Sequence, residues 1–142
     1  MADVELLEEL NAAATAVGRV VRLPAQLAEA LVANLSEAFV TNDASQWWWQ
    51  VLRVPSRRIE YGSGDGIAIL FDLIKAENSA VLVVTEDTHP PLALYEGAPE
   101  AIVEVIRQCR FFEYAVAAPD AGWAVFDTHM NELIVVGRLV AA

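Results

Sequence analysis

Residues 112–139, FEYAVAAPDAGWAVFDTHMNELIVVGRL, contain three apolar runs separated by two short breaks. The runs cover 112–118, 123–127 and 133–139. They are rich in the β-branched and aromatic side chains that favour strands. The breaks, 119–122 and 129–131, hold the Pro, Asp, Gly and Asn residues that are typical of tight turns. Because connections this short join antiparallel neighbours, the stretch predicts three consecutive antiparallel strands.

Two further apolar runs, 80–85 and 92–95, lie upstream and predict two more strands joined across His89-Pro90-Pro91. A helix over 99–110 is predicted between the two sets of strands, because Pro99 suits a first helical turn and basic residues suit a last one. The runs 80–85 and 133–139 are apolar on both faces, which favours a central position in the sheet. We therefore expect an antiparallel sheet of about five strands.

The N-terminal part of the chain reads as helical. Apolar residues at helical spacing predict a helix over 3–17, which Gly18 ends. Pro24 opens a second helix, whose apolar face contains Leu27, Leu31, Leu35 and Phe39. We expect these two helices to form an antiparallel helical hairpin.

The middle of the chain is less regular. Residues 45–54, which include Trp47-Trp48-Trp49, fit either a short strand or a one-turn helix that begins at Ser45. A third helix is predicted over about 66–76, with Asp65 as its N-cap. The complete prediction is an α+β fold in a single domain, 1–142, with a helical half, 1–76, and a mainly β half, 77–142.

Charge is the strongest indication of function. Asp and Glu number 20 against 9 Lys and Arg, giving a net charge of −11, yet 56% of the residues are apolar. The acid therefore decorates a folded surface, which disfavours nucleic acid and anionic membranes and favours a basic protein partner. No basic residue lies between Lys75 and Arg107, so we expect this segment to give one region a negative field. The carboxylates proposed as partner contacts are Glu86, Asp87, Glu96 and Asp127.

Three consecutive indoles, Trp47-Trp48-Trp49, cannot all face one core. One interpretation places all three between the helical half and the sheet. A second makes Trp47 and Trp48 interface anchors, a role that exposed Trp often has. A third, base stacking with single-stranded nucleic acid, would lack the cationic groove that such binding uses.

A repeated tripeptide offers a different kind of site. Asp87-Thr88-His89 and Asp127-Thr128-His129 each follow a predicted strand. If both strands end at the same edge of the sheet, Asp87, His89, Asp127 and His129 could hold a divalent transition metal. The alternative interpretation is that these segments bind no metal, because Asp and Thr commonly begin loops.

Other features favour structural roles. Cys109 is expected to be a small buried hydrophobic residue. The loop 62–66 lacks the Lys of a phosphate-binding loop. The three arginines Arg53, Arg57 and Arg58 are expected to pair with the chain's own carboxylates. No catalytic residue and no cofactor are predicted. The acidic N-terminus and the short apolar runs indicate a cytoplasmic protein that does not span a membrane.

Residues 44–139 resemble a family of small bacterial proteins that is catalogued as a domain of unknown function. The resemblance rests on the order of the Trp cluster, Leu52 and Pro55-Ser56, then 94–97 (LYEG), a helix, 111–114 (FFEY) and Gly122-Trp123. In its small, acidic, α+β character the chain is also similar to immunity proteins of bacterial polymorphic toxin systems. That resemblance implies a protein that binds and neutralises a cognate toxin, and no functional residue is carried over from it.

The leading hypothesis is a non-enzymatic immunity protein that occludes the basic active-site surface of a toxin. One alternative is a metal-dependent protein or enzyme that uses the paired Asp-Thr-His segments. Another is a structural or regulatory module that dimerises through an exposed strand or the tryptophans. The sequence leaves open whether the protein is a monomer or a dimer.

Overall fold

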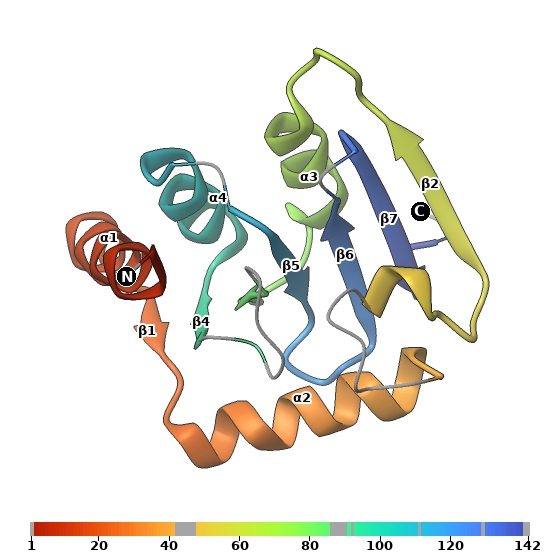
Figure 1. The fold of residues 1–142 in the computed structure, drawn as a ribbon, viewed down its shortest axis with the longest axis horizontal. Helices are drawn as coiled ribbons and strands as arrows, with labels where there is room; N and C mark the ends of the chain where they lie inside the picture. Colours follow the sequence, from red (N-terminus) through yellow and green to blue (C-terminus); the bar gives the residue numbers. More distant parts are fainter. Residues whose placement is uncertain are drawn as a thin grey trace.

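The computed structural model describes residues 2–41, 48–85, 91, 93–110, 112–128 and 130–140. These form a seven-stranded antiparallel sheet with the strand order β1-β4-β3-β5-β6-β7-β2 (Figure 1). The strands are β1 (Val21–Arg22), β2 (Ser56–Glu60), β3 (Ala80–Val84), β4 (Ala93–Gly97), β5 (Tyr114–Ala117), β6 (Trp123–Asp127) and β7 (Glu132–Gly137).

The three C-terminal strands form as the opening stretch predicts. β5, β6 and β7 are consecutive antiparallel neighbours. The β5–β6 turn is closed by the N–H of Ala121, which donates to the carbonyl of Ala118 at 3.0 Å, and by the N–H of Gly122, which donates to Asp120. Ala121 and Asn131 take positive φ in the two turns. β3 and β4 also lie at the predicted positions and are neighbours in the sheet.

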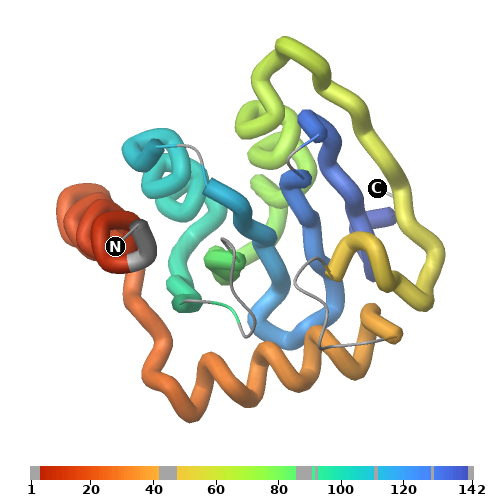
Figure 2. The backbone as a smooth tube through the Cα atoms, viewed as in Figure 1, coloured from red at the N-terminus to blue at the C-terminus, as the bar shows by residue number. Residues whose placement is uncertain are grey.

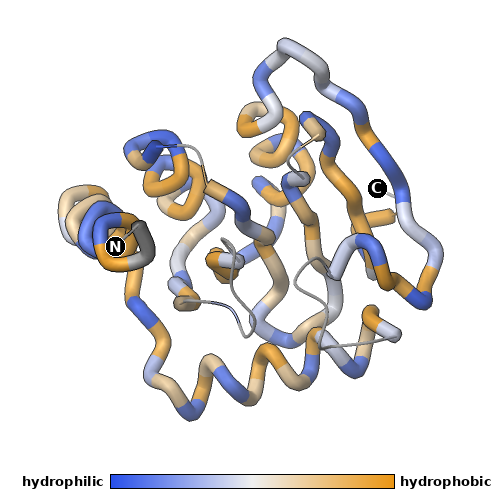
Figure 3. The backbone as a smooth tube through the Cα atoms, in the orientation of Figure 1, coloured by the Kyte–Doolittle hydropathy of each residue, from blue (hydrophilic) through white to orange (hydrophobic). Residues whose placement is uncertain are grey.

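Helices cover both faces of the sheet. On the first face, α1 (Ala2–Val17), α3 (Gly66–Ile74) and α4 (Pro99–Gln108) pack against alternate strand residues such as Leu82, Val116 and Val135. On the second face, α2 (Ala25–Phe39) and the 3₁₀ turn Trp48–Gln50 pack against the intervening residues, such as Val83 and Ile134. Figure 3 shows the central strands as largely hydrophobic, as expected of strands buried on both faces.

The expected N-terminal helical hairpin is wrong. Leu6 and Leu10 of α1 belong to the core of the first face, whereas Leu31 and Leu35 of α2 belong to that of the second. Gly18, at φ +77°, ends α1 as predicted, but the chain then adds β1 to the edge of the sheet beside β4. Figure 2 shows the chain passing from α1 through β1 into α2. This edge strand carries the chain from one face to the other.

The expected strand count of about five is also too low. The two additional strands, β1 and β2, are the two edges of the sheet. β1 has only two residues, and β2 reads Ser-Arg-Arg-Ile-Glu, with one apolar residue. Exposed edge strands carry polar and charged residues, so neither has the apolar pattern of a central strand. Because β1 and β2 come from residues 1–76, the helical half contributes to the same sheet as the β half.

The prediction for the third helix is confirmed. The carboxylate of Asp65 accepts a hydrogen bond from the N–H of Ala68 at 3.0 Å and caps α3. Of the two alternatives for the tryptophan segment, the helical turn is the one that forms, at Trp48–Gln50. The predicted start of this turn, Ser45, lies outside the described residues.

Candidate functional site

The described carboxylates between Lys75 and Arg107 do not gather on a single surface. Glu77 lies against a buried indole, and Glu96 is half-buried and accepts a hydrogen bond from the hydroxyl of Ser79 at 3.1 Å. Glu100 and Glu104 are exposed on α4. Glu86 and Asp87, two of the proposed partner contacts, lie outside the described residues.

The outer surface of α1, α3 and α4 carries more carboxylates than cations among the described residues. We call this surface the acidic layer. Its exposed carboxylates include Glu8, Asp72, Glu100 and Glu104. The cations beside them are engaged: Lys75 contacts Asp72 at 3.3 Å, Arg107 contacts Asp65 at 3.1 Å, and Arg110 contacts Glu9 at 3.3 Å and Glu5 at 3.7 Å. Within the described chain, Glu8, Glu100 and Glu104 have no ion-pair partner.

A shallow groove of about 290 Å³ lies between α3 and α4 within the acidic layer. Phe71, Val103 and Ala68 give it an apolar floor, and Asp72, Glu100 and Arg107 complete its wall. Lysine and arginine place an alkyl stem on apolar surface and keep the charged head at the edge. The groove therefore has the chemistry to accept a basic side chain from a partner.

Asp127 is buried, with 7% of its surface exposed, and it is held by two tyrosines. The hydroxyl of Tyr61 donates to its Oδ1 at 2.7 Å, and that of Tyr114 donates to its Oδ2 at 2.6 Å. Burial raises the pKa of Asp127, and the two phenol hydrogen bonds oppose that rise. Burial and the neighbouring carboxylate raise the pKa of both tyrosines. Both carboxylate oxygens are therefore occupied in this network of three residues, the Asp127 network.

The Asp127 network lines a cleft of about 630 Å³. The loop 62–66, Arg107 and Arg110 form other parts of its wall. Asp65 in this loop already caps α3 and binds Arg107, and these contacts lower its pKa. Cys109 also lines the cleft; it is half-buried, and burial raises the pKa of its thiol. The Cys109 side chain is thus a protonated thiol at neutral pH.

The backbone satisfies one condition of the proposed metal site. Val84, Tyr114 and Asp127 lie side by side across three strands, so β3 and β6 end on the same side of the sheet. Asp87, His89 and His129 lie outside the described residues. Each carboxylate oxygen of Asp127 already accepts a hydrogen bond from a tyrosine hydroxyl. Among the described residues, no group of three or more His, Cys, Asp or Glu side chains is placed to hold a metal ion.

Trp48 and Trp49 are buried, each with 8% of its surface exposed, in the core beneath α2. This is the placement that the packed interpretation expects for them. Trp47, the other proposed anchor, lies outside the described residues. Of the proposed partner contacts that the structure describes, Trp48 and Asp127 are thus buried and Glu96 is half-buried.

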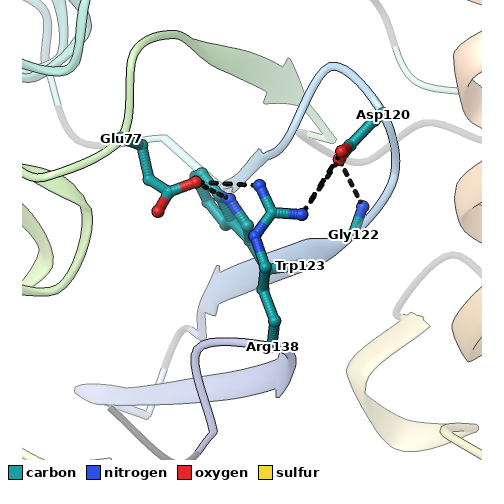
Figure 4. Close-up of polar contacts among 5 residues, drawn as sticks. All are labelled: Glu77, Asp120, Gly122, Trp123 and Arg138. Carbon is teal, nitrogen blue, oxygen red and sulfur yellow. Dashed lines mark hydrogen bonds and ion pairs between the residues drawn. The ribbon is translucent and has the colours of Figure 1, made fainter.

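A second polar network, which we call the Arg138 network, was not predicted (Figure 4). Oε1 of Glu77 accepts from the indole N–H of Trp123 at 2.8 Å and from the guanidinium of Arg138 at 2.9 Å. Arg138 also contacts Asp120 at 3.2 Å. Glu77 lies 46 positions before Trp123 and 61 before Arg138, so no local pattern in the sequence indicates the contact.

The arginine cluster partly follows its predicted role, since Arg58 contacts Glu132 at 3.0 Å. In the part of the chain that the structure describes, no helix is both long and apolar enough to cross a membrane. Comparison with protein-family models, with curated proteins and with solved structures gives no match to this chain.

Proposed function

We propose that this chain is a non-enzymatic binding protein that docks a basic protein partner on its acidic layer. We further propose that the partner is a cognate bacterial toxin in the cytoplasm, whose basic active-site surface the chain covers as an immunity protein does. The observation that carries the proposal is the groove between α3 and α4, where Asp72 and Glu100 stand beside an apolar floor.

The placement of Glu100 and Glu104 supports a role in binding. They are four residues apart on the exposed side of α4, a spacing at which like charges repel and lower helix stability by about 0.2–0.5 kcal/mol. Glu100 gains from the helix N-terminus, but Glu104 lies beyond the first turn, and within the described residues its polar contact is with Gln108 at 3.4 Å. Folding alone gains little from this second carboxylate, whereas a basic partner would gain from both.

The net charge of −11 supports the same proposal through kinetics. An acidic surface accelerates encounter with a basic one, and the acceleration falls as salt screens the charges. We expect an association rate constant that decreases steeply with ionic strength and a dissociation rate constant that changes little.

The test is co-expression with the reading frame directly beside this gene. We expect that reading frame to arrest cells that lack the chain and to be harmless in cells that contain it. The double variant Glu100→Lys with Glu104→Lys should lose protection, and its association with the purified partner should slow by at least about tenfold.

The matched control is Glu29→Lys with Glu37→Lys, which makes the same charge change at two exposed positions of α2 on the opposite face. This control should protect cells almost as well as the wild type. A harmless neighbouring reading frame, or equal protection by the two double variants, would overturn the proposal.

A further inference from the structure

β2 differs from the other edge of the sheet because it is long enough to pair again. It has five residues and pairs with β7 on one side, whereas β1 has two residues. In the described chain no strand pairs with the outer side of β2 (Figure 1). An unpaired edge of this length is a template for another strand.

The hydrogen-bond pattern shows which backbone groups face outward. The N–H of Tyr61 donates to the carbonyl of Asn131, opposite it on the β7 side, at 3.0 Å. Hydrogen-bonded and non-hydrogen-bonded pairs alternate along an antiparallel ladder. The backbone N–H and C=O groups of Ile59 therefore bond to β7. The backbone N–H and C=O groups of Arg58 and Glu60 point away from β7, to the unpaired side of β2.

In a single chain, the charged side chains of β2 are only partly paired with opposite charges. Glu60 lies directly opposite Glu132 in the β2–β7 pair, a like-charge arrangement that destabilises a sheet. Arg58 contacts Glu132, which is buried, through one amino group at 3.0 Å. The Arg58 side chain is still 52% exposed, so part of the guanidinium can donate to a second carboxylate.

A second copy of β2 would supply opposite charges for these side chains. If two β2 strands pair antiparallel about Ile59, Arg58 of each copy faces Glu60 of the other, and the two Ile59 side chains meet. The Arg58–Glu60 pairs are also the ones whose backbone groups face outward. The neighbouring register, centred on Arg58, would set arginine against arginine. Charged edges commonly prevent pairing, but here the charge pattern is complementary to itself in one register.

We propose that two copies of this chain associate through β2 in that register and join their sheets into one. This inference does not rest on the proposed toxin partner, because it uses the open edge of β2 (Figure 1) and not the groove between α3 and α4. The interface is one pair of short strands, so we expect a weak dimer with a dissociation constant on the order of tens of micromolar.

The test uses sedimentation velocity of the full chain from low micromolar to several hundred micromolar concentration. The wild type should shift from monomer to dimer over this range. Arg58→Glu sets two carboxylates against each other, and Glu60→Arg sets two guanidinium groups against each other. Each variant alone should dimerise at least about tenfold more weakly.

Mixing the two variants gives the decisive result. In a mixed dimer every facing pair is again opposite in charge, so an equimolar mixture should recover the dimer. Glu29→Arg on α2 makes the same charge change as Glu60→Arg away from the edge and should dimerise like the wild type. Circular dichroism melting of each variant separates lost pairing from lost folding.

Three outcomes would overturn the proposal. They are a wild type that stays monomeric at the highest concentration, a dimer that persists unchanged in both single variants, and a mixture that stays monomeric although both variants are folded. A dimer that persists in both variants would place the interface elsewhere, and pairing of β2 only with a strand of a foreign protein would identify a different occupant.

Discussion

Two aspartates at opposite ends of β6 show how position decides the properties of one side chain. Asp120 precedes the strand and is exposed, and the N–H of Gly122 together with the guanidinium of Arg138 holds its pKa below the usual value. Asp127 ends the strand and is buried, and burial raises its pKa although two phenols donate to it. Asp120 thus forms a solvent-exposed ion pair, whereas Asp127 is buried and accepts hydrogen bonds from two uncharged hydroxyl groups.

Loss of a side chain should destabilise the sheet more at the Asp127 end of β6 than at the Asp120 end. Each network joins segments that are distant in sequence: Tyr61 lies 66 residues from Asp127, and Glu77 lies 61 from Arg138. In the Asp127 network, loss of one member leaves buried groups without partners. In the Arg138 network, water can replace a lost ion pair.

The largest expected effect is that of Asp127→Ala. It removes the acceptor of two tyrosine hydroxyls, one of them on the buried Tyr114, and we expect a loss of about 3 kcal/mol in the free energy of unfolding. Urea denaturation at neutral pH measures this loss. Asp120→Ala is the matched variant at the other end of β6 and should lose well under half as much. Equal losses would contradict the contrast between the two ends.

The next effect distinguishes backbone from side-chain constraints around the Arg138 network. Gly137 has φ +81°, and a Cβ there would meet the carbonyl oxygen of Gly122 and the Cα of Trp123, which cannot move aside. Gly137→Ala should therefore cost about 2–3 kcal/mol. A Cβ at Gly122 meets the end of the Arg138 side chain, which can rotate away, so Gly122→Ala should cost about 1 kcal/mol. Thermal unfolding of both variants gives the ranking, and the reverse order would refute it.

The central strands could be predicted because they are buried on both faces. β3, for example, reads Ala-Val-Leu-Val-Val and is fully buried. β2 could not be predicted, because an edge strand needs little apolar surface and its charges find partners such as Glu132, 74 residues away. The position of α2 also could not be predicted, since an apolar helix face fits either side of a sheet.

The candidate site was predicted less well than the fold. The acidic composition indicated a basic partner. The stretch without basic residues between Lys75 and Arg107 did not predict a shared acidic surface, because Glu77 faces an indole and Glu100 faces solvent. Asp72 and Glu100, which both line the groove, lie on separate helices. Their placement in one groove depends on how α3 and α4 pack, which no local pattern contains.

A smaller effect is expected from Glu77→Gln. The amide oxygen can still accept from the indole of Trp123, but the charge that pairs with Arg138 is lost. We expect a loss of about 1 kcal/mol or less, because Arg138 is half exposed and water screens the pair. High salt should reduce the difference between variant and wild type when both are unfolded in urea. A difference that salt leaves unchanged would mean that packing, not charge, carries the effect.

The smallest effect is a difference in pH dependence between the two aspartates. Folding raises the pKa of Asp127, so the native state keeps that proton to higher pH than the unfolded chain. The resulting stabilisation is complete below the unfolded pKa and is lost as pH rises through the folded pKa. Folding lowers the pKa of Asp120, so its stabilisation is present above the unfolded pKa and is lost as pH falls through the folded one. Asp127→Asn should therefore flatten a decline in stability with rising pH, and Asp120→Asn should flatten a decline with falling pH. Unfolding free energies of both variants and the wild type across the acidic range separate the two slopes, and slopes of the same sign would show that burial does not dominate at Asp127.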